Sequence, residues 1–239
     1  MERKKTDTKD SVRRSDRQPA SPQDLEMFAH IERDLYTAVI SDALDETGHR
    51  DQAMRKEFRP LSPGFRLTGW ARTILCVDVF EIPEHTYALE IEAVDSLLPG
   101  EIAVVATGDS ERNAPWGELL STASRARGAR GAVVGGLVRD VNTILKLGFP
   151  VFATGVKPVD SKGRGVVVDY NVPIECGGVT VNPGDLVVGD LDGVIVVPSG
   201  LVSEVIAVAT DKVVRENHSR SELLAGAYLA DVYRKYGVL

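Results

Sequence analysis

Apolar positions recur along the chain with two periods, one typical of helices and one typical of strands. Residues 22–48 carry apolar side chains at helical spacing, which predicts one long helix. The positions on its apolar face are Phe28, Ile31, Leu35, Ala38 and Val39. Short apolar and β-branched runs predict strands further along the chain. They are Ala71–Phe80, Ile102–Thr107, Ala132–Val138, Pro150–Ala153 and Gly165–Val168.

The chain after residue 165 is richer in strands than the part before it. Cys176–Pro198 has the pattern of consecutive short strands, with turns at Pro183-Gly184-Asp185 and Asp192-Gly193. Further helices are expected at Glu84–Ser96, from Val202 to Val213, and near the C-terminus. Helices and strands that alternate in this way predict a single α/β domain with helices flanking a mixed sheet.

Residues 117–140 hold the candidate chemistry. Leu119–Gly128 has helical spacing with a glycine stop, and Gly131–Val138 has the composition of a buried strand. In a strand–helix–strand unit the helix runs antiparallel to its strands, so its start and the end of the next strand meet at one edge. Glu118 and the pair Arg139-Asp140 are therefore expected side by side, where open α/β sheets bind ligands.

The residue types at this edge suit a metal and a carboxylate. Aspartate is a hard oxygen ligand of the kind that Mg²⁺ prefers, and the planar fork of Arg139 suits a substrate carboxylate. Unpaired N–H groups at a helix start also favour an anion, and Gly117 permits close approach. Taken separately, Gly117-Glu118 also fits an ordinary turn with a dipole-stabilised acid, and Arg139-Asp140 fits a surface ion pair.

Composition narrows the class of protein. The 239 residues carry a net charge of −7, which argues against a nucleic-acid partner. No apolar run is long enough for a membrane span, and no signal peptide is evident. Cys76 and Cys176 match no metal or redox spacing, so buried free thiols in a reducing, cytoplasmic compartment are expected.

The N-terminal segment differs from the rest. Residues 1–22 hold seven Lys/Arg and four acids with almost nothing apolar. Such a segment cannot bury enough surface to offset its ordering entropy. We therefore expect a disordered basic tail over residues 1–22 and a folded domain over residues 23–239.

Other sites receive little support from the sequence. The four histidines are scattered, without an HExxH motif. Asp185, Asp190 and Asp192 lie among glycines and prolines, where turn chemistry explains them. Gly135-Gly136 does not make a dinucleotide-binding motif, and no GxSxG, phosphate-loop or Cys–His signature occurs.

With these residues in view, the chain resembles the RraA-like family over roughly residues 30–238. That family includes class II 4-hydroxy-4-methyl-2-oxoglutarate/4-carboxy-4-hydroxy-2-oxoadipate aldolases and the regulators of ribonuclease E activity. The likeness is densest at Pro115–Leu120, Arg127–Asp140, Phe149–Gly155 and Val172–Pro198. The family's aldolases also carry an acid, twenty residues and then Arg-Asp, as Glu118 and Arg139-Asp140 do here.

The resemblance implies a fold, an assembly and roles for residues. The fold would be an α/β/α sandwich related to swivelling phosphohistidine domains, in homotrimers or hexamers built from trimers with interfacial active sites. Asp140 would bind Mg²⁺ or Mn²⁺, and Arg139 would hold the pyruvate end of the substrate. Glu118 would hold a metal-bound water, and Glu216 of a neighbouring subunit would assist. The substrate carboxylate would lie against the amides of Gly117, Glu118, Leu119 and Leu120.

Glu118 is a departure from this pattern, since the family's aldolases have aspartate there and the longer side chain would ligate differently. The expected function is a metal-dependent carbon–carbon lyase acting on small 2-oxo acids, by retro-aldol cleavage, by oxaloacetate decarboxylation or by both. A metal-bound water held by Glu118 or Glu216 would be the base.

Trp116 and the insert Asp78–Glu92 would shape the pocket. The alternatives are a lyase for another sugar acid or dicarboxylate and a non-catalytic protein that regulates a ribonuclease or other enzyme.

Overall fold

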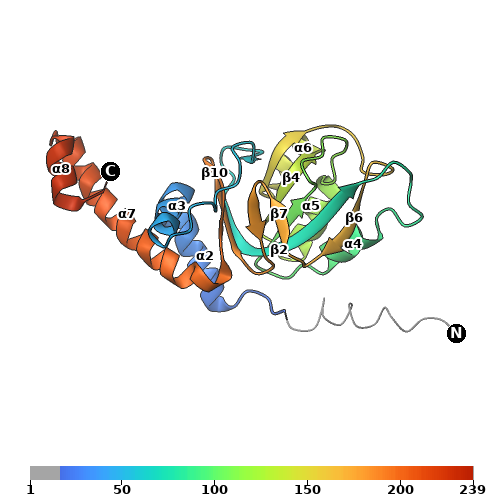
Figure 1. Cartoon of the computed structure of the whole chain (residues 1–239), viewed down its shortest axis with the longest axis horizontal. Coiled ribbons are helices and arrows are strands. Elements are labelled where there is room, and N and C mark those ends of the chain that lie inside the picture. Colours follow the sequence, from blue (N-terminus) through green and yellow to red (C-terminus); the bar gives the residue numbers. More distant parts are fainter. Residues whose placement is uncertain (1–16, 239) are drawn as a thin grey trace.

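The fold is built around one eight-stranded mixed sheet that curls strongly (Figure 1). The computed structural model describes residues 17–238. The strand order is β1-β5-β4-β3-β2-β9-β10, and β6 pairs with the far half of β2. Strands β2, β3, β4 and β5 are parallel, and the other pairings are antiparallel. The strands are β1 (Arg59–Pro60), β2 (Leu67–Asp78), β3 (Glu101–Ala106), β4 (Gly131–Val138), β5 (Val151–Val156), β6 (Gly165–Tyr170), β9 (Leu186–Asp190) and β10 (Gly193–Val197).

Alternating side chains along each strand fill two separate regions. On β3, Ile102 and Val104 point into the concave side of the curl, while Ala103 and Val105 point outward. The concave side is closed by a small hairpin made of β7 (Ile174–Cys176) and β8 (Val179–Val181). Both faces of the central strands are therefore buried, which explains why their sequences are almost continuously apolar.

Two groups of helices cover the outer surface of the curled sheet. One group packs on the parallel strands, and the other packs on β9 and β10. The first group is α4 (Ala88–Asp95), α5 (Glu118–Ala126) and α6 (Val141–Leu147). The second is α2 (Pro22–Asp34), α3 (Thr37–Glu46) and α7 (Val202–Leu224), followed by α8 (Leu229–Tyr236). The expected α/β class is confirmed, with a sheet that closes further than a flat sandwich.

The predicted single helix over residues 22–48 is wrong, because the chain forms α2 and α3 with a break between them. Leu35 is extended (φ −110°, ψ 169°), and Tyr36 is extended as well. Asp190 at the end of β9 accepts hydrogen bonds from the Thr37 backbone N–H at 2.8 Å and from the Thr37 hydroxyl at 2.7 Å. A carboxylate from the sheet thus caps the start of α3. This long-range contact has no signature in the local spacing.

Other boundaries also shift. β2 starts at Leu67 rather than Ala71, α4 starts at Ala88 rather than Glu84, and α7 continues to Leu224. The short elements β1 and α6 were not expected. Both cysteines are buried and free, as expected.

The predicted basic tail divides into two parts. Residues 1–16 lie outside the described residues. Arg17 forms an ion pair with Glu101, and the N–H of Ala20 donates to the carbonyl of Pro99 at 2.9 Å. Ser21 then caps α2 together with Asp24. Within residues 17–238, no helix has the length and apolar character needed to cross a lipid bilayer.

Candidate active site

The end of β4 and the start of α5 meet at one edge of the sheet. Trp116 forms an isolated parallel bridge with Val138, and the Arg139 N–H donates to the Trp116 carbonyl at 3.0 Å. The Glu118 N–H lies 3.3 Å from Asp140 Oδ2. The strand–helix–strand order in the sequence predicted this proximity, and the described structure has it.

Gly117 lies directly against the two charged side chains. A Cβ atom placed on it would be 2.7 Å from Asp140 Oδ2 and 3.1 Å from Arg139 Cγ. Its φ of −152° is open to any residue. The glycine is therefore needed for space, because a side chain here would displace the arginine and the aspartate.

Asp140 adopts a left-handed conformation, with φ 58° and ψ 30°. Such a backbone is uncommon for residues other than glycine, although aspartate and asparagine tolerate it. It turns the chain from β4 into α6, where the Asp140 carbonyl accepts the N–H groups of Thr143 and Ile144. The carboxylate is left facing Gly117 and Glu118 at the pocket edge.

A pocket of about 400 Å³ opens at this edge. Arg139 lies between two carboxylates there, with Nε 3.6 Å from Asp140 Oδ2 and Nη2 3.4 Å from Asp160 Oδ1. The Tyr87 hydroxyl donates to the other Asp160 oxygen. The side chains that line the pocket include Tyr87, Glu90, Ile91, Trp116, Leu119, Leu120, Arg139, Asp140 and Asp160.

The surroundings of the pocket shift the pKa values of two of its carboxylic acids, Glu90 and Asp160, in opposite directions. Burial, and then the nearby charge of Asp160, raise the pKa of Glu90 to about 7, while Arg139 partly opposes the shift. Burial alone would raise the pKa of Asp160, but hydrogen bonds from Tyr87 and from backbone N–H groups, with the Arg139 charge, lower it overall. The hydrogen bond to Asp160 raises the pKa of Tyr87 to about 12. A pocket with one acid near neutrality and one firmly ionised is typical of catalytic sites.

The start of α5 offers free backbone donors. No side chain caps the helix at Gly117. Among residues 17–238, no acceptor is found for the N–H groups of Leu119 and Leu120. Both residues line the pocket, so these donors suit a carboxylate there.

The structure places Glu118 and Glu216 outside this pocket. The Glu118 carboxylate accepts the Thr122 hydroxyl at 2.8 Å along α5 and is absent from the pocket lining. Glu216 lies on α7, accepts the Tyr36 hydroxyl, and lines a different pocket with Arg220. The outer half of α7 extends away from the sheet (Figure 1). Of the site residues predicted from the sequence, all of which lie in the described part of the chain, only Arg139, Asp140 and the start of α5 come together within one chain.

The residues present fit a magnesium-type ion held by few protein ligands. Among the described residues, no three His, Cys, Asp or Glu side chains are grouped to hold a metal. Mg²⁺ commonly uses one or two carboxylates and completes its shell with waters and substrate oxygens. The contacts of the Asp140 carboxylate found in this part of the chain involve Oδ2. Asp140 Oδ1 is thus the oxygen that would hold the ion.

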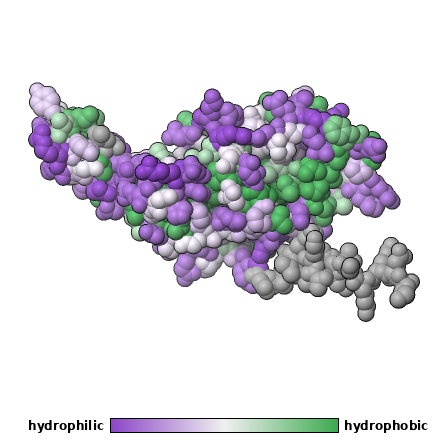
Figure 2. All heavy atoms as spheres, in the orientation of Figure 1, coloured by the Kyte–Doolittle hydropathy of each residue, from purple (hydrophilic) through white to green (hydrophobic). Residues whose placement is uncertain are grey.

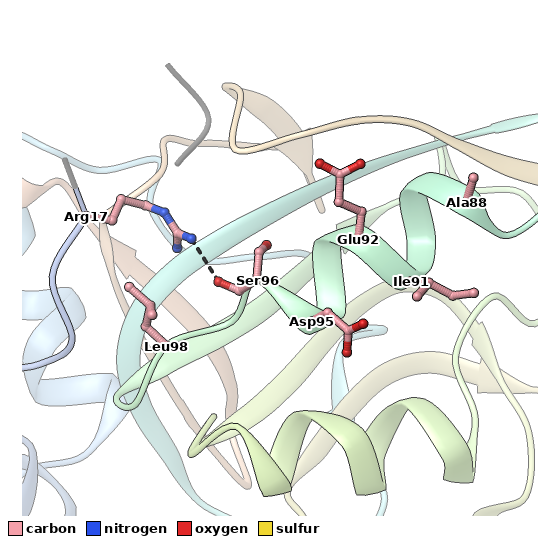
Figure 3. Close-up of a pocket in the computed structure, with 7 residues that line it drawn as sticks. All are labelled: Arg17, Ala88, Ile91, Glu92, Asp95, Ser96 and Leu98. Atoms are coloured by element: carbon pink, nitrogen blue, oxygen red, sulfur yellow. Dashed lines mark hydrogen bonds between the residues drawn. The ribbon is translucent and has the colours of Figure 1, made fainter. Parts of the chain in front are cut away.

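A second pocket, of about 480 Å³, lies along α4 towards Arg17 and Leu98 (Figure 3). Its Arg17 is already bonded to the Ser96 carbonyl at 2.8 Å and to Glu101. Its Asp95 lies 3.4 Å from Arg127. It contains neither Arg139 nor the start of α5, so we do not assign it the chemistry.

Sequence reasoning did not single out Tyr87, Glu90 or Asp160. The insert Asp78–Glu92 had been expected to shape the pocket, and it supplies the first two of these residues. Asp160 follows β5, the neighbour of β4, and so reaches the same edge. The predicted end of that strand, Ala153, was three residues short of its true end at Val156. The sequence therefore did not indicate that Asp160 follows the strand closely.

Comparison with known proteins assigns the chain to a family. Residues 37–196 match the RraA-like family, described as Aldolase/RraA. The chain belongs to the RraA-like family. A Halalkalibacterium halodurans protein provisionally named 4-hydroxy-4-methyl-2-oxoglutarate aldolase is 35% identical over 75% of this chain and 80% of that protein. An Azotobacter vinelandii protein with the same provisional name is 37% identical over 46% of this chain and 67% of that one.

One similar solved structure comes from a protein named for ribonuclease inhibition rather than for aldolase activity. Streptomyces coelicolor RraAS2, described as an unusual member of the RNase ES inhibitor RraA family, is 29% identical with a TM-score of 0.75. The match covers 86% of this chain and 99% of that chain. The RraA-like fold is therefore shared by proteins named for aldolase activity and for ribonuclease inhibition.

Proposed function

We propose that this RraA-like protein is a divalent-metal-dependent carbon–carbon lyase acting on small 2-oxo acids. It would release pyruvate by retro-aldol cleavage of 4-hydroxy-4-methyl-2-oxoglutarate-type substrates, by decarboxylating oxaloacetate, or by both. The observation that carries the proposal is the single pocket that joins Arg139, Asp140 and the start of α5.

Each part of the pocket suits one part of such a substrate. The free N–H groups of Leu119 and Leu120 would bind the 1-carboxylate. Arg139 would bind the 2-oxo end and stabilise the negative charge that develops as the bond to C3 breaks. Asp160 pairs with that guanidinium, and the Tyr87 hydroxyl donates to the other oxygen of Asp160.

The metal would be Mg²⁺ or Mn²⁺, held by Asp140, with Glu118 contacting it through water. Its chemistry is that of a Lewis acid, drawing electrons from the 2-oxo group. The expected water-holding role of Glu118 requires its carboxylate to turn from Thr122, its present partner.

The proposed assembly is a homotrimer, or a hexamer of trimers. Glu216 is remote from the pocket of its own chain, so it would act only in the pocket of a neighbouring copy. Exposed apolar side chains support contact between copies, since large apolar patches usually mark interfaces. Phe80, Ile82 and Val156 are 82%, 66% and 61% exposed. Apolar surface also gathers on the sheet-bearing half of the molecule in Figure 2.

The test is pyruvate release from purified protein. Oxaloacetate and 4-hydroxy-4-methyl-2-oxoglutarate would each be supplied with Mg²⁺ and then with chelator, and pyruvate followed with lactate dehydrogenase. We expect metal-dependent pyruvate from at least one compound, lost in Arg139→Ala and in Asp140→Asn. Turnover that survives chelation or Asp140→Asn contradicts the metal assignment.

The similarity to RraAS2 favours one other candidate, a protein that regulates a ribonuclease or other enzyme through its surface. That candidate predicts no turnover and no metal binding. Pyruvate released from neither compound, with metal still bound at Asp140, would instead indicate a different 2-oxo acid or sugar acid as the substrate.

A further inference from the structure

Retro-aldol cleavage needs a group that oxaloacetate decarboxylation does not. A base must take the proton from the 4-hydroxyl group before the C3–C4 bond breaks, whereas loss of CO₂ requires no such proton transfer. Resting on the function proposed above, we propose that Glu90 is this proton acceptor and that it gives the site its aldolase activity.

Glu90 is placed for this role by α4. This helix lies beside α5, and Glu90 lines the same pocket as Arg139 and Asp140. Within residues 17–238, the Glu90 carboxylate has no hydrogen bond or ion pair. A half-buried carboxylate with no such partner, open to a pocket, is free to accept a proton from a ligand.

The other carboxylates near the pocket are already engaged. Asp160 contacts Arg139 through one oxygen and the Tyr87 hydroxyl through the other. Asp140 faces the Glu118 N–H and Arg139 and is the proposed metal ligand. Glu118 accepts the Thr122 hydroxyl outside the pocket. Among the acids of the described pocket, only Glu90 has neither oxygen committed.

The surroundings of Glu90 suit a base that works near neutral pH. Its burial and the Asp160 charge raise its pKa to about 7, and Arg139 opposes them. On β2, the buried Cys76 thiol has its own pKa raised to about 12, first by burial and then by the charge of Glu90. A base with a pKa near the working pH gives the most efficient proton transfer.

The remaining titratable groups on the neighbouring elements face other partners. Glu92 on α4 accepts the Tyr170 hydroxyl. Asp169 on β6, which packs on α4, accepts the Tyr170 N–H at 2.9 Å. On α5, the acid is Glu118 with its Thr122 partner.

The step balances without an external reagent. The 4-hydroxyl proton moves to a Glu90 oxygen, and its electron pair forms the C4 carbonyl. The C3–C4 bond breaks, and its electrons form the enolate of pyruvate. Water protonates C3, and Glu90 returns its proton to solvent. With 4-hydroxy-4-methyl-2-oxoglutarate the products are two molecules of pyruvate.

The experiment compares the two reactions in one variant. Glu90→Gln keeps the size and polarity of the side chain but cannot accept the proton. We expect kcat for 4-hydroxy-4-methyl-2-oxoglutarate cleavage to fall about 100-fold or more, while oxaloacetate decarboxylation stays within about threefold. Glu84→Gln, whose side chain is 89% exposed just before α4, is the matched control and should change neither.

The pH profile gives an independent readout. In the wild type, kcat for cleavage should rise as Glu90 ionises near pH 7, and Glu90→Gln should lose this rise. Glu90→Asp should recover part of the cleavage rate. Equal loss of both reactions, or no loss of cleavage, in Glu90→Gln overturns the proposal and leaves the lyase function standing. No pyruvate from either compound with the wild type overturns both.

Discussion

The backbone N–H of Glu118 lies 3.3 Å from Asp140 Oδ2, although the two residues are 22 positions apart in the chain. This contact joins the start of α5 to the turn after β4. The start of the helix and the proposed metal ligand are therefore in direct contact, at the edge of one pocket.

Asp140 has a charged side chain and a left-handed backbone conformation, and two substitutions test these two features separately. Asparagine tolerates the left-handed φ of 58°, so Asp140→Asn should keep the free energy of unfolding within about 0.5 kcal/mol of the wild type. Alanine does not tolerate it, and Asp140→Ala should lose about 1 kcal/mol more. Urea unfolding measures both. Metal-dependent pyruvate release should be lost in both variants, and retention in Asp140→Asn would contradict the ligand role.

A substitution at Gly117 tests whether the close contact between its backbone and the Arg139 and Asp140 side chains is needed for activity. In Gly117→Ala the new Cβ would lie 2.7 Å from Asp140 Oδ2, so the carboxylate must move. The backbone itself accepts alanine at φ −152°. We expect kcat/KM to fall about tenfold to 100-fold with little change in Tm. Gly64→Ala, where a Cβ meets no atom within 4 Å, is the control and should keep full activity.

Glu90 should make stability depend on pH in a predictable direction. Its pKa is raised from 4.5 to about 7 in the folded chain, so between these values the folded state holds a proton that the unfolded state has lost. The free energy of unfolding should therefore fall as pH rises from about 4.5 to 7, and the penalty should stay constant above that range. Below it, the carboxyl is protonated in both states.

Glu90→Gln removes this penalty. In metal-free protein, the variant should match the wild type at pH 4 and exceed it at pH 8 by about 2–3 kcal/mol. Urea unfolding at a series of pH values measures the difference. Glu84→Gln should show no such trend, and a pH-independent difference for Glu90→Gln would show that its pKa is not raised.

Asp190 holds the start of α3 in place. Its two oxygens accept from the Thr37 N–H at 2.8 Å and the Thr37 hydroxyl at 2.7 Å, in a buried environment. Asp190→Asn replaces one acceptor by a donor that faces these groups, which should cost about 1–2 kcal/mol. Asp192→Asn, in the exposed turn that follows, should change stability by less than about 0.5 kcal/mol. Equal effects from the two substitutions would contradict the capping role.

The parts of the site that the sequence predicted are those linked by one strand–helix–strand unit. Gly117, Arg139 and Asp140 lie on consecutive elements, so helix and strand periods suffice to bring them to one edge. Tyr87 directly precedes α4 and Glu90 lies on it, before that unit, and Asp160 comes from the loop after β5. Their placement depends on how α4 packs beside α5 and on where β5 ends, and neither is encoded in local spacing.

The sequence alone determined the α/β class, the buried parallel strands and the acid and arginine at one sheet edge, because burial and backbone geometry impose short-range periods on the residues. Only the tertiary structure decided the curl of the sheet, the break between α2 and α3, and the pairing of Asp160 with Arg139. It also decided the raised pKa of Glu90, because that shift arises from burial and from charges distant in sequence. These features depend on contacts between segments far apart in the chain, for which no single stretch of residues carries a signal.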